Sequence, residues 1–238
     1  MAFVSSHRAR IRSTLKTMSL VAGAATAMAA ADAHASIITD TSIFSKGPST
    51  FINFETTGAG APIVLIDGQR LAMPTNSYSP QGVSFLGAGT STVYWVNDGN
   101  AAFDAAQAAG ASLNNSIPSS LTNQFTMTFS VPVRAFGFFV ANNRLVDPAG
   151  PSFVARDAAG VIIESAQFGP AFIDGTITTP NTVADYGFMG ILANRDIASV
   201  TITKQAAILD DLRFTQIPSP APLALAGFGG ILMLRRRR

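Results

Sequence analysis

The chain has 238 residues, enough for one domain of ordinary size, with 47% hydrophobic residues, 13% charged residues and no cysteine. Its formal net charge of +2 comes from the two ends, because residues 36–217 carry eight basic and 13 acidic side chains, and this distribution does not indicate nucleic-acid binding. Histidine occurs only at His7 and His34, which excludes histidine-dependent nucleophilic catalysis and His/Cys metal sites from everything beyond residue 35.

Residues 1–35 have the three parts of a secretory signal peptide. Basic residues continue to Lys16, residues 18–31 are apolar, and Ala33-His34-Ala35 is a small-x-small cleavage site before Ser36. The apolar stretch is rich in alanine and is shorter than the ~20 residues that a membrane-spanning helix needs. We therefore expect signal peptidase to cleave before Ser36. The alternative is a short anchoring helix that is retained.

Residues 36–216 alternate apolar and polar side chains in short segments separated by Gly, Pro, Asn and Asp, a pattern typical of β-strands. The clearest predicted strands are 51–55, 82–86, 92–96, 124–130, 133–140, 152–157, 161–165, 197–204 and 208–214. Residues 157–160 (DAAG), where strand 152–157 meets strand 161–165, are typical of a hairpin turn. The alanine-rich stretch 100–110 is the exception, since it could form a short helix before a long irregular connection. The pattern predicts an all-β, antiparallel, jelly-roll-like β-sandwich.

One segment carries the residue types of a sugar-binding site. Tyr94 and Trp95 are followed by Asn97 and Asp98, and an aromatic face beside amide and carboxylate groups suits a pyranose ring. Trp95 is the only tryptophan in the chain, and it could equally be a core residue of the sandwich. The sequence leaves both interpretations open.

Asp210 occupies a strand position that would normally be apolar. In a regular strand it shares a face with Ile208, Leu212 and Phe214, so the carboxylate would be buried and would need a cation or several hydrogen-bond donors. Calcium is suitable because it takes oxygen ligands. The alternatives are a bulge that turns Asp210 to solvent, or a pair with Arg213 or Arg134.

An enzyme of the glycoside hydrolase type would need paired carboxylates. Many acidic residues of this chain lie beside turn residues instead, as in Asp67-Gly68, Asp98-Gly99 and Asp174-Gly175. Turn formation accounts for such residues without catalysis. We therefore expect a non-catalytic protein, with a secreted glycoside hydrolase as the less favoured alternative.

The C-terminal segment, 217–238, has the organisation of a sorting or anchoring signal. Residues 221–234 are apolar, and four arginines follow at once: Arg235, Arg236, Arg237 and Arg238. A helix of these 14 residues is about 21 Å long, shorter than the ~30 Å hydrocarbon core, but local thinning and arginine snorkelling could close the gap. The arginines should remain cytoplasmic, which holds the domain on the exported side of the inner membrane. An amphipathic surface helix is the alternative, although the run has no polar face.

Pro218-Ser219-Pro220, the short glycine-containing apolar run and the arginine cluster together resemble the PEP-CTERM sorting signal of Gram-negative bacteria. Proteins with this signal are typically exported, and the resemblance implies an exosortase-like enzyme that recognises and processes the segment. This chain has Ser219 where the family has glutamate. The departure bears on which sorting enzyme would act, and less on membrane targeting.

The domain also resembles the β-sandwich domains that commonly precede such signals. The matching segments are 52–55, 131–138, 153–160, 197–202 and 210–214. In similar jelly rolls, an acidic residue on the first core strand and another on the last often share a structural calcium, which implies Glu55 with Asp210 or Asp211. Many such domains also resemble carbohydrate-binding jelly rolls, an analogy of fold. The chain is thus expected to be a surface or extracellular-matrix protein, or else a binding module for exopolysaccharide.

Overall fold

The computed structural model describes residues 35–89, 92–97, 112–116, 124–204 and 206–215. The predicted signal peptide, the 100–110 stretch, Asp98 and the whole sorting segment lie outside these ranges. Within the described ranges, no helix has the length and apolar character needed to cross a membrane.

Twelve strands and three short 3₁₀ helices make up the described domain, and every strand pairing is antiparallel. The strands are β1 Ser36–Ile38, β2 Ser49–Ile52, β3 Arg70–Ala72, β4 Val83–Gly87, β5 Thr92–Val96, β6 Ser112–Ser116, β7 Gln124–Asn143, β8 Ser152–Arg156, β9 Ile162–Gln167, β10 Gly175–Thr179, β11 Thr182–Thr203 and β12 Ala207–Thr215. The helices are η1 Ser42–Ser45, η2 Ser79–Gln81 and η3 Pro170–Phe172. The prediction of an all-β, antiparallel domain is confirmed.

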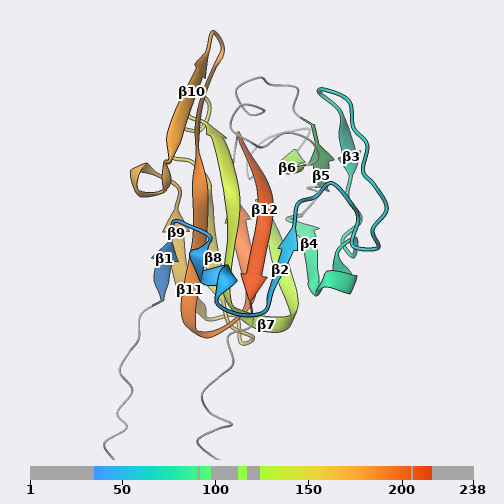
Figure 1. Ribbon diagram of the computed structural model, residues 1–238, viewed down its shortest axis with the longest axis vertical. Coiled ribbons are helices and arrows are strands. Elements are labelled where there is room, and N and C mark those ends of the chain that lie inside the picture. The colour runs from blue at the N-terminus through green and yellow to red at the C-terminus, as the bar shows by residue number, and fades with distance from the viewer. Residues whose placement is uncertain (1–34, 90–91, 98–111, 117–123, 205, 216–238) are drawn as a thin grey trace, which may run out of the picture. The chain divides into compact units, whose positions relative to one another are not determined.

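Two long strands, β7 and β11, contribute to both layers of the domain. The first part of β7, residues 124–128, pairs with the last part of β11, residues 199–203. The strand order in this layer is β4–β7–β11–β8–β9. The last part of β7 and the first part of β11 also pair with each other, in a second layer. Its strand order is β2–β12–β7–β11, and β1 and β10 pair with the other edge of β11. Both strands turn at the lower end of Figure 1, where the β7–β11 register shifts between Leu192 and Ser199.

The core lies between these two layers. Phe125, Met127 and Phe153 reach it from the first layer, and Phe136 and Phe138 from the second. The rings of Phe136 and Phe138 each lie 5.8 Å from that of Phe153, centroid to centroid, so aromatic contacts join the layers directly. The alternation predicted for 124–130 is therefore what buries this face.

Several predicted boundaries differ from the observed ones. The segments 124–130 and 133–140 belong to one strand, β7, which bends around the exposed Val131-Pro132. The predicted strand 51–55 ends at Ile52 because Phe54 has a left-handed backbone, with φ of 60°. The 157–160 turn is as predicted: the Asp157 carboxylate accepts the N–H groups of Ala159 and Val161.

Candidate functional site

The β2–β12 ladder has an unusual backbone at one end. Phe54 and Asp211, with φ of 60° and 51°, are the non-glycine residues with positive φ in the described part of the chain. Both lie beyond the last pair of the ladder, Leu212 with Ile52: Asp211 is adjacent to Leu212 in the chain, and Phe54 is two residues after Ile52. Residues other than glycine rarely adopt this conformation, and it costs of order 1–3 kcal/mol where it occurs. Surrounding contacts must hold both residues in place.

A β-bulge at Asp211 changes which residues share a face of β12. Asp210 pairs with Phe139 and Arg213 with Gly137, so β12 has one extra residue there. Leu212 and Phe214 consequently lie in the main core with Leu209, while Ile208 belongs to a separate cluster on the outer side of the layer. The expectation that Asp210 shares a face with Leu212 and Phe214 is therefore wrong.

Asp210 is nevertheless buried, with 5% of its surface exposed. One of its carboxylate oxygens accepts the Asp211 N–H at 2.7 Å, which stabilises the bulge. The two arginines considered as partners of Asp210 make contacts with other residues. Arg134 pairs with Asp196 at 2.6 Å, and the Arg213 guanidinium lies 4.5 Å above the Phe51 ring. Burial raises the pKa of the Asp211 carboxyl, and the positive charge of Arg213 partly offsets that rise.

Tyr78 lies where this acidic end meets the core. Burial raises the pKa of its hydroxyl, the hydrogen bond from Trp95 opposes the rise, and the negative charges of Asp210 and Glu55 add to it. The negative charges of both carboxylates therefore act on the same hydroxyl group. Glu55 follows the strained Phe54, and its N–H is held by the Asn53 side-chain oxygen at 3.2 Å.

The predicted aromatic sugar site is not assembled by the described residues. Trp95 is buried, and its Nε1 donates to the Tyr78 hydroxyl at 2.9 Å, which in turn donates to the Thr56 carbonyl at 2.9 Å. Its ring faces the core and has no surface for a sugar, so the core interpretation of Trp95 is the right one. Tyr94 alternates with it on β5 and lies on the other face, half-buried. The Asn97 amide donates to the Leu65 carbonyl at 3.3 Å.

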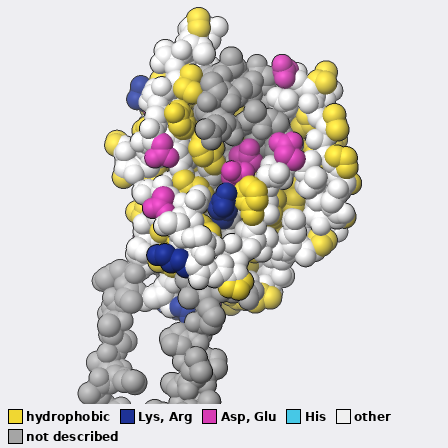
Figure 2. All heavy atoms as spheres, in the orientation of Figure 1, with side chains coloured by type: hydrophobic (Ala, Val, Ile, Leu, Met, Phe, Trp, Pro, Cys, Tyr) yellow, Lys and Arg dark blue, Asp and Glu magenta, His cyan; other side chains and the backbone are white. Residues whose placement is uncertain are grey.

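Metal binding by side chains alone is not supported. In the part of the chain that the structure describes, no three His, Cys, Asp or Glu residues converge as a metal site requires. An ion held by Glu55 with Asp210 or Asp211 would need backbone carbonyls or water as further ligands, which calcium accepts. Figure 2 shows acidic side chains near the centre of the face on which Figure 1 displays β2 and β12.

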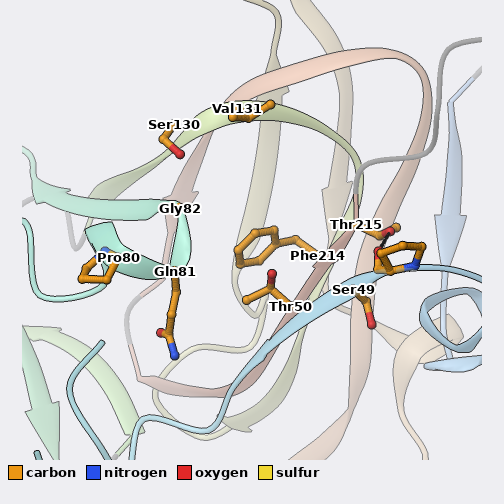
Figure 3. Close-up of a pocket in the computed structure, with 10 residues that line it drawn as sticks. Ser49, Thr50, Pro80, Gln81, Gly82, Ser130, Val131, Phe214 and Thr215 are labelled. Carbon is orange, nitrogen blue, oxygen red and sulfur yellow. Dashed lines mark hydrogen bonds between the residues drawn. The ribbon is translucent and has the colours of Figure 1, made fainter. Parts of the chain in front are cut away.

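A pocket of about 380 Å³ opens at the opposite end of the same ladder. Four segments line it: residues 48–50 of the β2 edge, the η2 turn at 80–82, the β7 bend at 130–131, and the end of β12 at 214–215. Figure 3 shows Phe214 centrally, with Pro80 and Gln81 on one side and Ser49 and Thr215 on the other. No sequence motif indicated this pocket, because its segments are far apart in the chain.

Comparisons with known proteins identify no family. No family model matches the chain, and no curated protein matches it. One similar solved structure is the K1 cleaved adhesin domain of Lys-gingipain from Porphyromonas gingivalis W83, with 12% identity, a TM-score of 0.40, and coverage of 72% of this chain and 100% of that one. Another is the enzymatically active domain of tailspike protein 4 from bacteriophage CBA120, with 18% identity, a TM-score of 0.29, and coverage of 56% and 18% respectively. Both likenesses are too low to assign a shared topology or activity.

Proposed function

We propose that this protein is an exported, non-catalytic β-sandwich protein of the cell surface or extracellular matrix, directed there by its C-terminal segment. The organisation of the chain carries the proposal: one all-β body stands between a segment with signal-peptide features and an apolar run that ends in four arginines. The Pro218-Ser219-Pro220 variant of the PEP-CTERM pattern supports processing by an exosortase-like enzyme.

The placement of the two ends of the body supports this arrangement. Ser36 pairs with Leu192, Leu192 with Ala135, and Ala135 with Thr215, so the first strand begins and the last strand ends in one row across the sheet. Figure 1 shows both at the same end of the domain. A domain attached to the membrane through residues 217–238 would therefore present its other end, which bears β10 and β3, to the exterior.

The absence of histidine and cysteine beyond residue 34 supports a non-catalytic role. Two of the carboxylates also have structural functions. Asp157 caps its turn and pairs with Arg195 at 2.7 Å. Asp185 accepts the Thr176 hydroxyl at 2.6 Å and lies 3.3 Å from Arg144.

A structural calcium ion held by Glu55 with Asp210 or Asp211, and completed by backbone carbonyls or water, is part of the proposal. The negative charges gathered near Tyr78, the raised pKa of the Asp211 carboxyl and the strained backbone at Phe54 and Asp211 are all features that a bound cation would compensate. The ion would bind the carboxylates in their ionised form and hold β2 against β12 at the bulge.

Mass spectrometry of the mature protein from its native host tests export and sorting together. The expected product begins at Ser36 and has lost part or all of residues 217–238. A product that retains both Met1 and the four C-terminal arginines would contradict the proposal. A variant that lacks residues 221–238 should also leave the membrane fraction, and its sedimentation with membranes after a high-salt wash would place the anchor elsewhere.

A carbohydrate-binding module is the second candidate function, and the pocket favours it. The pocket lies where β2, η2, β7 and β12 meet and is lined by hydroxyl, amide and aromatic groups. If this function is correct, the site is the pocket rather than the Tyr94–Trp95 segment.

A further inference from the structure

The pocket bounded by η2, the β7 bend and the β2–β12 ladder has the features of a small-molecule site. We propose that it binds one neutral sugar ring, as a unit of a polysaccharide. This inference rests on the second candidate function and names its site and its ligand class.

The charge of the lining selects the ligand class. None of the residues that line the pocket is ionisable: they are Pro48, Ser49, Thr50, Pro80, Gln81, Gly82, Ser130, Val131, Phe214 and Thr215. A charged ligand would lose hydration without gaining an ionic partner, and burying an unpaired charge is costly. Uronates, sulfated sugars and other charged small molecules are therefore disfavoured relative to neutral ones.

The polar groups of the lining match the hydroxyl groups of a sugar. Within the described residues, the hydroxyls of Ser49, Thr50 and Ser130 take part in none of the hydrogen bonds. The Gln81 amide oxygen also has no hydrogen-bond partner there, but it is closed to solvent, so a ligand reaches it only when the side chain turns toward the pocket. A buried acceptor without a partner costs roughly 1–3 kcal/mol. Hydroxyl groups donate and accept, so they complement a ligand that does the same around a ring.

Phe214 supplies an apolar surface next to these groups. Its ring lines the pocket although only 7% of the residue is exposed. It packs against Phe129 with 5.2 Å between ring centroids, so its position is set by the core. With so little of it exposed, the ring forms an apolar floor to the pocket rather than a stacking face, so the polar groups of the rim carry the recognition of the sugar.

The walls are formed by regular hydrogen bonding rather than by a loop that must close. Gly82 adopts φ of +89°, and its carbonyl accepts the Ser130 N–H at 2.9 Å, which fixes the η2 turn against the β7 bend. On the other side, the Thr215 hydroxyl donates to the Pro48 carbonyl. A preformed site of about 380 Å³ is near the lower limit of ligand pockets, which suits a single ring rather than a long chain segment.

The test uses the full chain, purified in a detergent without a sugar headgroup. Affinity electrophoresis measures retardation by dextran and galactomannan as neutral polysaccharides, and by alginate as a charged one. NMR titration with glucose, galactose and mannose locates the contact and shows whether a free sugar suffices. Thr50→Val and Gln81→Leu remove one polar group each, and Thr178→Val makes the same Thr-to-Val exchange at an exposed position of β10. Thermal melting verifies that each variant is folded.

We expect retardation by a neutral polysaccharide, a weakening of about five- to tenfold in Thr50→Val and in Gln81→Leu, and no change in Thr178→Val. Amide shifts caused by the free sugars should centre on residues 48–50, 80–82, 130–131 and 214–215. Stronger retardation by alginate, shifts centred elsewhere, or no response to any of these sugars would overturn the proposal. Binding is measured on purified protein, so it can fail while export succeeds, and the reverse also holds.

Discussion

The two ends of the β2–β12 ladder differ in almost every physical respect. At one end, the buried Asp210 and the partly buried Glu55 and Asp211 bring negative charge to a strained backbone. At the other, Thr50 pairs with Phe214 and Ser49 with Thr215 in regular register, and the pocket that they line carries no charge. The same pair of strands therefore carries two different candidate sites.

The difference indicates separate roles. An acidic, strained junction is stabilised by a cation, so we expect calcium there to act on the stability of the fold. The walls of the neutral pocket are fixed by backbone hydrogen bonds, so we expect binding of the proposed ligand there to leave the fold unchanged. Variants at one end should affect only the property that belongs to that end.

Calcium should have the largest effect on stability. If the ion binds only the folded protein, calcium at 100 times its Kd adds ~2.7 kcal/mol, enough to raise the melting temperature by several degrees. Asp210→Asn keeps the shape of the side chain but removes its charge, so it should abolish most of this gain. Melting curves in EDTA and in millimolar calcium measure both effects.

Asp174→Asn is the matched control, since Asp174 is exposed beside a turn. Its calcium response should equal that of the unmodified protein. An unmodified protein that melts at the same temperature in EDTA and in calcium would end the calcium hypothesis, and the contrast between the two ends would then be one of strain alone.

Tyr78→Phe should have the next largest effect. The substitution removes the hydroxyl that accepts from Trp95 and donates to the Thr56 carbonyl. It leaves a buried indole N–H without its partner, which costs about 2 kcal/mol. Denaturant unfolding should show this loss, while retardation by neutral polysaccharides should be unchanged. A loss of retardation in the folded variant would show that the two ends are coupled.

The sequence predicted the fold best where a strand buries one face. Alternation identified 92–96 and 152–157 almost to the residue, because the pleat sends every second side chain to the core. The first half of β11 was missed because both its faces are covered. Phe188 packs on Phe44 of η1 at 5.9 Å, while Met189 and Ile191 face the main core. A strand buried on both sides has no period-two pattern to detect.

The candidate sites were harder to predict because they depend on contacts between distant segments. A buried Asp210 was expected from its apolar neighbours, but the bulge that decides its face comes from the β7–β12 register. Trp95 has the same local sequence whether it faces a sugar or the core, and only its bond to Tyr78 decides between them. The pocket combines four segments that have no common motif.

Asp211→Asn should give a small gain in stability in EDTA at pH 7. Burial raises the pKa of this carboxyl, so its ionised form is disfavoured in the folded state. Asparagine removes that charge and also tolerates the left-handed backbone. The expected gain is below about 1 kcal/mol at this half-buried position. In calcium the variant should instead be less stable than the unmodified protein, because it has lost a ligand of the ion. An equal effect with and without calcium would remove Asp211 from the proposed ion site.

Arg213→Gln should have the smallest effect, and its dependence on pH is informative. Arg213 holds the pKa of the Asp211 carboxyl below the value that burial alone would give, so its loss raises that pKa further. A carboxyl whose pKa is raised on folding destabilises the fold when ionised, and this cost disappears as pH falls through the folded-state pKa. The variant should therefore be less stable than the unmodified protein at pH 7 in EDTA.

This gap in the free energy of unfolding between the two proteins should narrow on acidification. It should become constant below about pH 4, the ordinary pKa of aspartate. The remaining gap measures the contact between Arg213 and Phe51, which is independent of pH. In an Asp211→Asn background, the same substitution should give a gap that does not change with pH. If the gap narrows there as well, another acidic group near Arg213 titrates, and the electrostatic account of this end of the ladder must include it.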